Sequence, residues 1–134
     1  MKIVLDTNVL ISALIKPGKS RQLLSEVIKR RHELILSEEI LAELTRVANE
    51  AKIRKYVDQR DISEYLQSIV MASKVVKIVS KFQIVMEDPD DDIILQTAYD
   101  AGADYVVSGD RHLLSLEKSM DLRILSVEEM LSVV

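Results

Sequence analysis

The stretch KIVLDTNVLIS, residues 2–12, joins two apolar runs through a single acidic residue and a short polar turn. Its first run, Lys2–Leu5, is typical of a buried β-strand, and its second run has the spacing of a helix. Asp6 lies between them, followed by Thr7 and Asn8. Because a buried carboxylate is costly without a partner, this position predicts either a helix cap or a functional acid at the end of a strand.

The composition predicts one folded domain over residues 1–134, with 48% hydrophobic and 30% charged residues. The absence of cysteine excludes disulfides, thiolate metal sites and a cysteine nucleophile. Neither a signal-peptide pattern nor an apolar run of about 18 residues is present, so we expect a cytoplasmic protein that does not enter a membrane. Residues 1–60 carry 12 Lys/Arg and 8 Asp/Glu (net +4), whereas residues 61–134 carry 6 and 14 (net −8). This asymmetry is consistent with a polyanion-binding surface beside a cation site, or with ordinary solvated charge.

Short apolar runs alternate with helical patterns along the chain, which indicates α/β units around a mainly parallel sheet. Strands are predicted at Ile3–Leu5, Leu34–Leu36, Val75–Val79, Tyr105–Val107 and Ile124–Leu125. Helices are predicted at Val9–Ile15, Arg21–Arg31, Glu38–Ala48, Ile62–Ser73, Asp90–Ala101 and Val127–Leu131. The interval from Leu36 to Val75 must hold two or three helices, and its charged residues 49–61 are predicted to form a mobile connection. Ser20 is a candidate N-cap for the second helix.

Two predicted strands end in acids, Asp6 after the first and Asp110 after the short turn that follows Tyr105–Val107. Ligands of an open parallel sheet bind at the carboxyl ends of its strands, so both acids would lie at the binding edge. Taken singly, each could instead cap the helix that follows it, Asp110 through the helix expected around Leu113. Their shared location favours a functional role over two separate caps.

The segment Glu87–Asp92 places five carboxylates within six residues at the start of a predicted helix. Asp88 suits the N-cap, Pro89 the first helical position and Gly102 the C-terminal stop. Acids in a first turn gain about 0.3–1 kcal/mol each from the helix dipole. Mutual repulsion offsets much of that gain unless a cation neutralises some of the charge. Both the dipole and a cation therefore remain explanations of this cluster.

The helix predicted at Glu38–Ala48 carries Glu43 beside the edge of its apolar stripe, where the side chain can reach inward over a rim. Glu39 and Glu50 lie only slightly further round the helix, and a solvated glutamate is the ordinary alternative for all three. Carboxylates that converge without cysteine would make an all-oxygen site, which suits Mg²⁺ or Mn²⁺ better than zinc. Such an ion activates water and stabilises a phosphate, so the predicted reaction class is phosphodiester hydrolysis.

Four segments together resemble a PIN-domain nuclease, most closely the toxin-like PIN proteins related to VapC. They are IVLDTNVLISAL (3–14), EEILAEL (38–44), DPDDDIILQTAYDAGADYVVSGDRHLL (88–114) and ILSVEEML (124–131). The resemblance covers nearly the whole chain. It implies a three-layer α/β/α sandwich with a parallel five-stranded sheet of order 3-2-1-4-5, in which the strands ending at Asp6 and near Asp110 are neighbours.

The resemblance also implies which residues form the site. Asp6 matches the acid of the family's first motif, Glu43 the acid of the central helix, and Asp110 the acid of the [TS]-G-D motif. The remaining acid is one of three consecutive aspartates; the spacing to Gly102 selects Asp91, with Asp92 as the next choice and a further metal ligand. Two polar residues, Asn8 and Ser108, match positions that orient the acids or waters. Asp6, Glu43, Asp91 and Asp110 would be the catalytic residues and would hold Mg²⁺ or Mn²⁺.

The function implied is that of a metal-dependent endoribonuclease, the toxin component of a toxin-antitoxin pair, with an antitoxin partner and a homodimer expected. Two alternatives are an RNA-processing PIN nuclease that is not a toxin, and a catalytically silent module that binds RNA or a partner. A phosphatase of the haloacid dehalogenase type is disfavoured because Asn8 stands where that family needs a second aspartate. Aromatic residues make up only 4% of the chain, which favours recognition of the RNA backbone or help from a partner. Candidate RNA-binding residues are Arg46, Lys52, Arg54 and Lys55.

Overall fold

The computed structural model describes residues 1–80, 89–110 and 122–134, and for residues 89–91 it describes the backbone alone. Within these ranges the chain forms a five-stranded sheet of order β3-β2-β1-β4-β5, and every neighbouring pair of strands is parallel. The strands are β1 (Lys2–Leu5), β2 (Glu33–Ser37), β3 (Ser73–Val76), β4 (Tyr105–Val107) and β5 (Arg123–Leu125). The sheet order expected from the sequence is confirmed.

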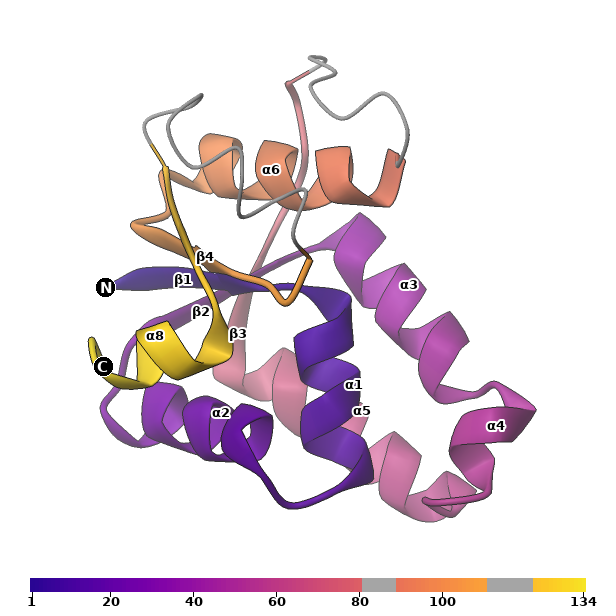
Figure 1. The fold of residues 1–134 in the computed structure, drawn as a ribbon. Coiled ribbons are helices and arrows are strands. Elements are labelled where there is room, and N and C mark those ends of the chain that lie inside the picture. Colours follow the sequence, from indigo (N-terminus) through magenta and orange to yellow (C-terminus); the bar gives the residue numbers. More distant parts are fainter. Residues whose placement is uncertain (81–88, 111–121) are drawn as a thin grey trace.

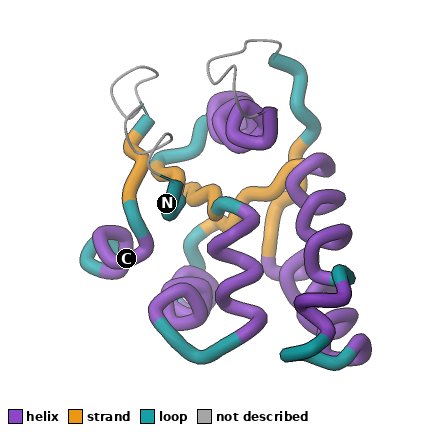
Figure 2. The backbone as a smooth tube through the Cα atoms, turned by 45° about the vertical axis from the view of Figure 1, so that its right-hand side comes forward, coloured by secondary structure: helices purple, strands orange, loops and turns teal. Residues whose placement is uncertain are grey.

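Helices cover both faces of this sheet, as Figures 1 and 2 show. Helix α6 lies on one face, and α1, α2 and α8 lie on the other, with α3, α4 and α5 toward the β3 side. Their bounds are α1 (Thr7–Ile15), α2 (Lys19–Lys29), α3 (Glu38–Ala48), α4 (Ala51–Arg54), α5 (Gln59–Ala72), α6 (Pro89–Ala101) and α8 (Val127–Leu131). Because both faces are covered, the central strands carry continuous apolar runs instead of an alternating pattern.

Strand β1 lies at the centre of the sheet and decides where the functional edge forms. Its residues Ile3, Val4 and Leu5 are completely buried. Leu5 pairs with Val107 of β4, so both strands end at the same edge. The backbone N–H of Asp6 continues the ladder by donating to the Val107 carbonyl at 2.9 Å. The first residue after β1 is thereby held against the end of β4.

The bounds of β3 and the start of α2 differ from the sequence prediction. β3 begins two residues earlier than expected, and the backbone N–H groups of Val79 and Ser80 instead donate to the Asp100 carboxylate at 2.7 and 3.0 Å. Helix α2 begins at Lys19 with Gly18 as its N-cap, so the prediction that Ser20 caps it was wrong. The cause is the short connection from α1, in which the Gln22 N–H already reaches the Gly18 carbonyl at 2.9 Å.

Residues 49–61, predicted as a mobile connection, contain the short helix α4 and the first turn of α5. Buried Ile53 attaches the short helix α4 to the core. Asp58 then caps α5 by accepting a hydrogen bond from the Asp61 N–H at 2.9 Å. The interval between β2 and β3 consequently holds three helices, at the upper end of the prediction. In the described part of the chain no helix has the length and apolar character that crossing a membrane requires.

The C-terminal end of α6 confirms the role predicted for Gly102. This residue has a φ of +63°, the left-handed conformation that glycine adopts without a steric penalty. The Gly102 N–H donates to the Tyr99 carbonyl at 3.2 Å, and the Ala103 N–H to the Ala98 carbonyl at 2.9 Å. This pair of bonds ends the helix and turns the chain into β4.

Candidate active site

Asp6 and Asp110 are brought together by one buried serine. The Ser108 hydroxyl donates to Oδ2 of Asp6 at 2.7 Å, and it accepts the backbone N–H of Asp110 at 2.9 Å. Ser108 is 0% exposed and Asp6 is 8% exposed. The two acids predicted at the ends of neighbouring strands therefore share one polar connection at this edge of the sheet.

Asp6 is also the N-cap of α1, which confirms that it has the capping role considered for it. Its Oδ1 accepts the backbone N–H of Asn8 at 3.4 Å. Asn8 thus acts on Asp6 through its backbone, while its side chain is exposed. Burial raises the pKa of Asp6 above its ordinary value, the Ser108 hydrogen bond lowers it in part, and the negative charge of Asp110 raises it further. A residue that only caps a helix does not need a buried, ionised carboxylate. A bound cation would reduce the free-energy cost of burying that charge.

Glu43 reaches the same region from α3. The Thr7 hydroxyl donates to Oε2 of Glu43 at 3.2 Å, and Thr7 is the residue next to Asp6. Glu43 lies beside the edge of the apolar stripe of α3, slightly closer to it than Glu39 and Glu50, and this position agrees with the contact. Glu50 instead forms ion pairs with Arg46 and Lys52.

Glu39 lies one turn before Glu43 on the same face of α3, because residues four apart are helical neighbours. Its Oε2 is buried and has no hydrogen-bond partner among the described residues. A buried carboxylate oxygen without a donor has lost hydrogen bonds to water that the protein does not replace. The α3 face that holds Glu43 thus presents an additional negative oxygen that a cation would stabilise.

Asp92 belongs to the first turn of α6 and is 5% exposed. That turn lies beside the start of α3, and α6 also packs on β1 and β4 (Figure 1). The side chains of Asp90 and Asp91 are outside the described residues, so the choice of Asp91 ahead of Asp92 stays a prediction. Further along α6, a buried hydrogen bond joins the Thr97 hydroxyl to that of Ser37, the N-cap of α3, with the two oxygens 2.8 Å apart.

We use the term acid cluster for Asp6, Glu43, Asp92 and Asp110. Its donors are carboxylate oxygens supported by hydroxyl groups, which is the chemistry of a site for a hard divalent ion. In the ranges that the structure describes, no three acidic or histidine side chains meet closely enough to ligate one ion. The raised pKa of Asp6 and the buried Oε2 of Glu39 nevertheless fit a cation, because both record negative charge without full compensation.

Sequence reasoning missed three hydroxyl residues that support the acids. Thr7 holds Glu43, whereas Ser37 and Thr97 lock α3 against α6. Ser37 also caps α3 by accepting the Ile40 N–H at 3.2 Å. Thr7 and Ser37 were detectable as polar residues at or directly after the ends of strands; Thr97 had no such signal, since a threonine inside a helix is common.

The four predicted RNA-binding residues divide into two pairs. Arg46 and Lys52 contact Glu50, at 3.3 and 3.5 Å. Arg54 and Lys55, at the end of α4, are exposed and have no ion pair within the described residues. The second pair thus keeps its positive charge available for an anion.

Comparisons with known proteins agree with the fold described above. A family profile described as the PIN domain matches residues 2–112. An uncharacterised protein of Methanocaldococcus jannaschii, MJ1680, is 32% identical over 118 residues, which are 87% of this chain and 75% of that protein.

Two solved structures have the same fold. VapBC2 from Rickettsia felis, bound to a DNA fragment from its promoter, aligns with a TM-score of 0.64 and 17% identity over 94% of this chain and 98% of that one. PAE2754 from Pyrobaculum aerophilum aligns with a TM-score of 0.65 and 18% identity over 98% of this chain and 88% of that one. At 17% and 18% identity, these two matches show a shared fold and nothing further.

Proposed function

Since this chain belongs to the PIN-domain family, whose members are in general nucleases that use divalent metal ions, we propose that it is a metal-dependent endoribonuclease. The proposal treats residues 1–134 as one PIN domain that hydrolyses RNA phosphodiester bonds with Mg²⁺ or Mn²⁺. A purely structural PIN-like module would have no reason to keep ionisable groups in an unfavourable environment.

One observation carries the proposal: Asp6 is buried and held by Ser108 beside a second acid, Asp110. Burial and like charge both raise the pKa of Asp6, so the protein alone does not stabilise this carboxylate in its ionised form. Groups kept in such an unfavourable state cluster at functional sites. A helix cap would be equally effective with asparagine or serine, neither of which carries the cost.

The acids have distinct positions around the site. Asp6 and Asp110 would hold the cation from the sheet, Glu43 from α3, and Asp91 or Asp92 from the first turn of α6. When bound, a divalent cation activates water and stabilises negative charge on the phosphate. Ser108 and Thr7 keep the carboxylates oriented, and neither needs to act as a nucleophile.

We propose further that the chain is a toxin that pairs with an antitoxin, and that it forms a homodimer. Support for the antitoxin partner comes from the Rickettsia felis structure, which is a VapBC2 complex. The prediction is that induced expression of the wild-type chain arrests growth of a bacterial host, whereas the Asp6→Asn variant does not. Growth that is unaffected by an active wild-type enzyme would favour an RNA-processing nuclease instead.

The decisive experiment measures cleavage of single-stranded and hairpin RNA in the presence of Mn²⁺ or Mg²⁺. We expect Asp6→Asn to abolish cleavage while its circular dichroism spectrum stays that of the wild type. The matched control is Asp61→Asn, an exposed aspartate on α5. Full activity of Asp6→Asn, or an equal loss in Asp61→Asn, would refute the assignment.

A second readout tests the cation without relying on activity. Mn²⁺ should raise the melting temperature of the wild type and should do so much less in Asp6→Asn, because the ligand would stabilise the folded state only. Comparing Asp91→Asn with Asp92→Asn in the same assay identifies which aspartate of α6 contributes. An undiminished Mn²⁺ shift in all three variants would place the cation elsewhere.

A further inference from the structure

A groove on the exposed side of α1 leads away from the acid cluster. It has a volume of about 410 Å³ and is lined by Asn8, Ile11, Ser12, Ile15, Lys16 and Tyr56. Asn8 donates its backbone N–H to Asp6, so the groove begins at the cluster itself. The eight residue steps from Asn8 to Lys16 correspond to a rise of about 12 Å along a helix. We call this feature the α1 groove.

Tyr56 forms the wall of the α1 groove opposite the helix, and its side chain is 72% exposed. Its backbone is fixed, because the Tyr56 N–H donates to the Ile53 carbonyl at 2.9 Å and Ile53 is buried in the core. The next residue, Val57, is packed against the same core. A large ring held at this exposure by an ordered turn is a preformed surface for stacking.

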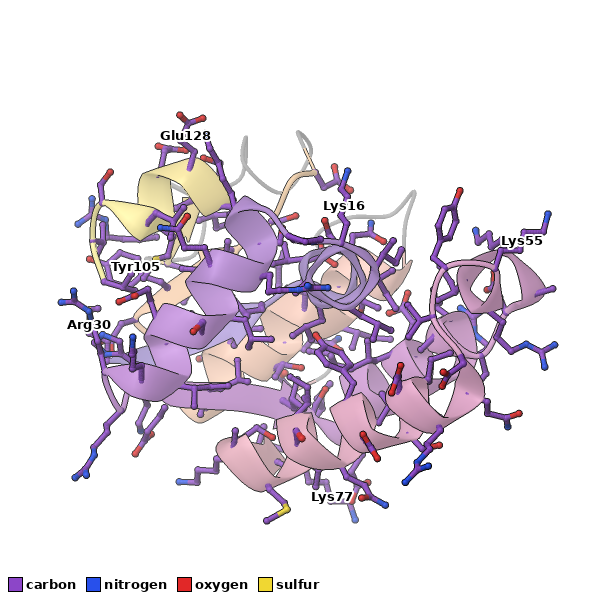
Figure 3. All side chains as sticks on the ribbon, turned by 90° about the horizontal axis from the view of Figure 1, so that it is seen from below. Lys16, Arg30, Lys55, Lys77, Tyr105 and Glu128 are labelled. Atoms are coloured by element: carbon purple, nitrogen blue, oxygen red, sulfur yellow. The ribbon has the colours of Figure 1, made fainter. Side chains whose placement is uncertain are left out.

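The charges around the α1 groove favour an anionic occupant. Lys16 lies at its far end, and Arg54 and Lys55 precede Tyr56 directly. None of these three has an ion pair within the described parts of the chain, whereas nearby Lys52 is paired with Glu50. Figure 3 shows the side chains of Lys16, which follows α1, and Lys55, which follows α4, extending outward.

The second pocket that Tyr56 lines differs in charge. It contains two carboxylates, Asp58 and Asp61, and one cation, Arg21, whose guanidinium is already bonded to the Ala13 and Leu14 carbonyls. Those carboxylates repel a phosphate backbone, while no carboxylate of the described residues lines the α1 groove. A polyanion that reaches Tyr56 is therefore directed along α1, toward the acid cluster.

Resting on the nuclease function proposed above, we propose that Tyr56 is a substrate-positioning residue for single-stranded RNA. An unpaired base stacks on its ring, and the RNA backbone follows the α1 groove between Lys16 and the acid cluster, with Arg54 and Lys55 contacting phosphates. Aromatic rings bind bases of any sequence by stacking, and cations along the strand supply the remaining affinity. The small number of aromatic residues in the chain thus does not preclude a stacking platform, because one of them lies beside the site.

Tyr56→Trp gives a direct spectroscopic test, since the natural chain contains no tryptophan. The variant is made in the Asp6→Asn background, where RNA is not consumed, and is titrated with a single-stranded oligouridylate. Stacking predicts quenching of the tryptophan fluorescence that saturates with the same midpoint as RNA binding measured by anisotropy. Binding without any change in fluorescence would overturn the proposal.

Affinity and kinetics provide the second arm. Tyr56→Ala should weaken oligouridylate binding by roughly 5- to 150-fold, and Tyr56→Phe should restore it, because the ring and not the hydroxyl is used. In the otherwise wild-type enzyme the change to alanine should raise KM and leave kcat nearly unaltered. The matched control is Tyr99→Ala, which removes a ring that is 60% exposed on α6.

The outcomes separate this proposal from the nuclease function on which it rests. If RNA quenches the fluorescence of the Tyr56→Trp variant but the wild type cleaves nothing, only the function is refuted. If the wild type cleaves and Tyr56→Ala binds and cleaves like Tyr99→Ala, the positioning role is refuted. Loss of a protein partner's binding in Tyr56→Ala with RNA affinity intact would likewise overturn it, since the α1 groove would then be a protein-binding site.

Discussion

Replacing Ser108 by alanine should destabilise the fold and perturb Asp6 at the same time. The side chain is fully buried and makes two hydrogen bonds, one to the Asp6 carboxylate at 2.7 Å and one from the Asp110 N–H at 2.9 Å. A bond to a charged group contributes about 1.5–3 kcal/mol and a neutral one about 0.5–1.5 kcal/mol, so we expect Ser108→Ala to cost about 2–4 kcal/mol at neutral pH.

The cost should depend on pH, in a direction that follows from the pKa of Asp6. Burial raises that pKa in the folded state, and Ser108 is the largest influence that lowers it. With the folded pKa above the unfolded one, the native state binds the proton more tightly, so the free energy of unfolding falls as pH rises through the Asp6 pKa. Ser108→Ala raises this pKa further, so the free energy of unfolding falls over a wider range of pH. The variant therefore loses more stability at pH 7.5 than at pH 4.5.

The assay is urea unfolding followed by circular dichroism at several pH values between 4.5 and 8, for wild type and variant. A double-mutant cycle with Asp6→Asn isolates the charged hydrogen bond, because the carboxylate is absent from that background. Ser25→Ala, an exposed change on α2, is the control and should stay within about 0.5 kcal/mol of wild type. A cost of Ser108→Ala that is independent of pH and unchanged in the Asp6→Asn background would refute the reasoning.

Three further changes test how the site is supported. Asp6→Asn should raise the melting temperature at pH 7 without metal, because the ionised carboxylate that burial disfavours is removed; a lower melting temperature at that pH would contradict this. Thr97→Val should cost about 1–3 kcal/mol in urea unfolding, since it removes the buried bond to Ser37, and a neutral effect would show that the α3–α6 contact does not need it. Leu44→Ala should cost about 2–5 kcal/mol, and half-buried Leu41→Ala clearly less, because Leu44 is completely buried beside Glu43.

Much of the fold could be predicted from local patterns. Continuous apolar runs such as Lys2–Leu5 indicated buried parallel strands, and Gly102 indicated the end of α6 because few residues tolerate a positive φ. The errors fell where tertiary contacts override local signals. Val79 is apolar enough for a strand, yet its N–H donates to Asp100. The charged residues 49–61 contain the helix α4 because Ile53 reaches the core.

For the site, the sequence by itself determined the residue types and their order along the chain. An acid directly after a buried strand must lie at the carboxyl edge of the sheet, because strand direction and side-chain period are local properties. Spacing also marked Asp110 and Glu43 as candidates, and the resemblance to the PIN family placed them in one site.

Only the tertiary structure decided how these groups act on one another. The bond from Ser108 to Asp6 spans 102 residues and the bond from Thr7 to Glu43 spans 36, so neither could be read from local sequence. The raised pKa of Asp6 and the exposure of Tyr56 likewise depend on what packs around them, and burial is a property of the whole fold. The sequence therefore specified which acids were available, and packing determined that Asp6 would be buried at a cost that a cation can offset.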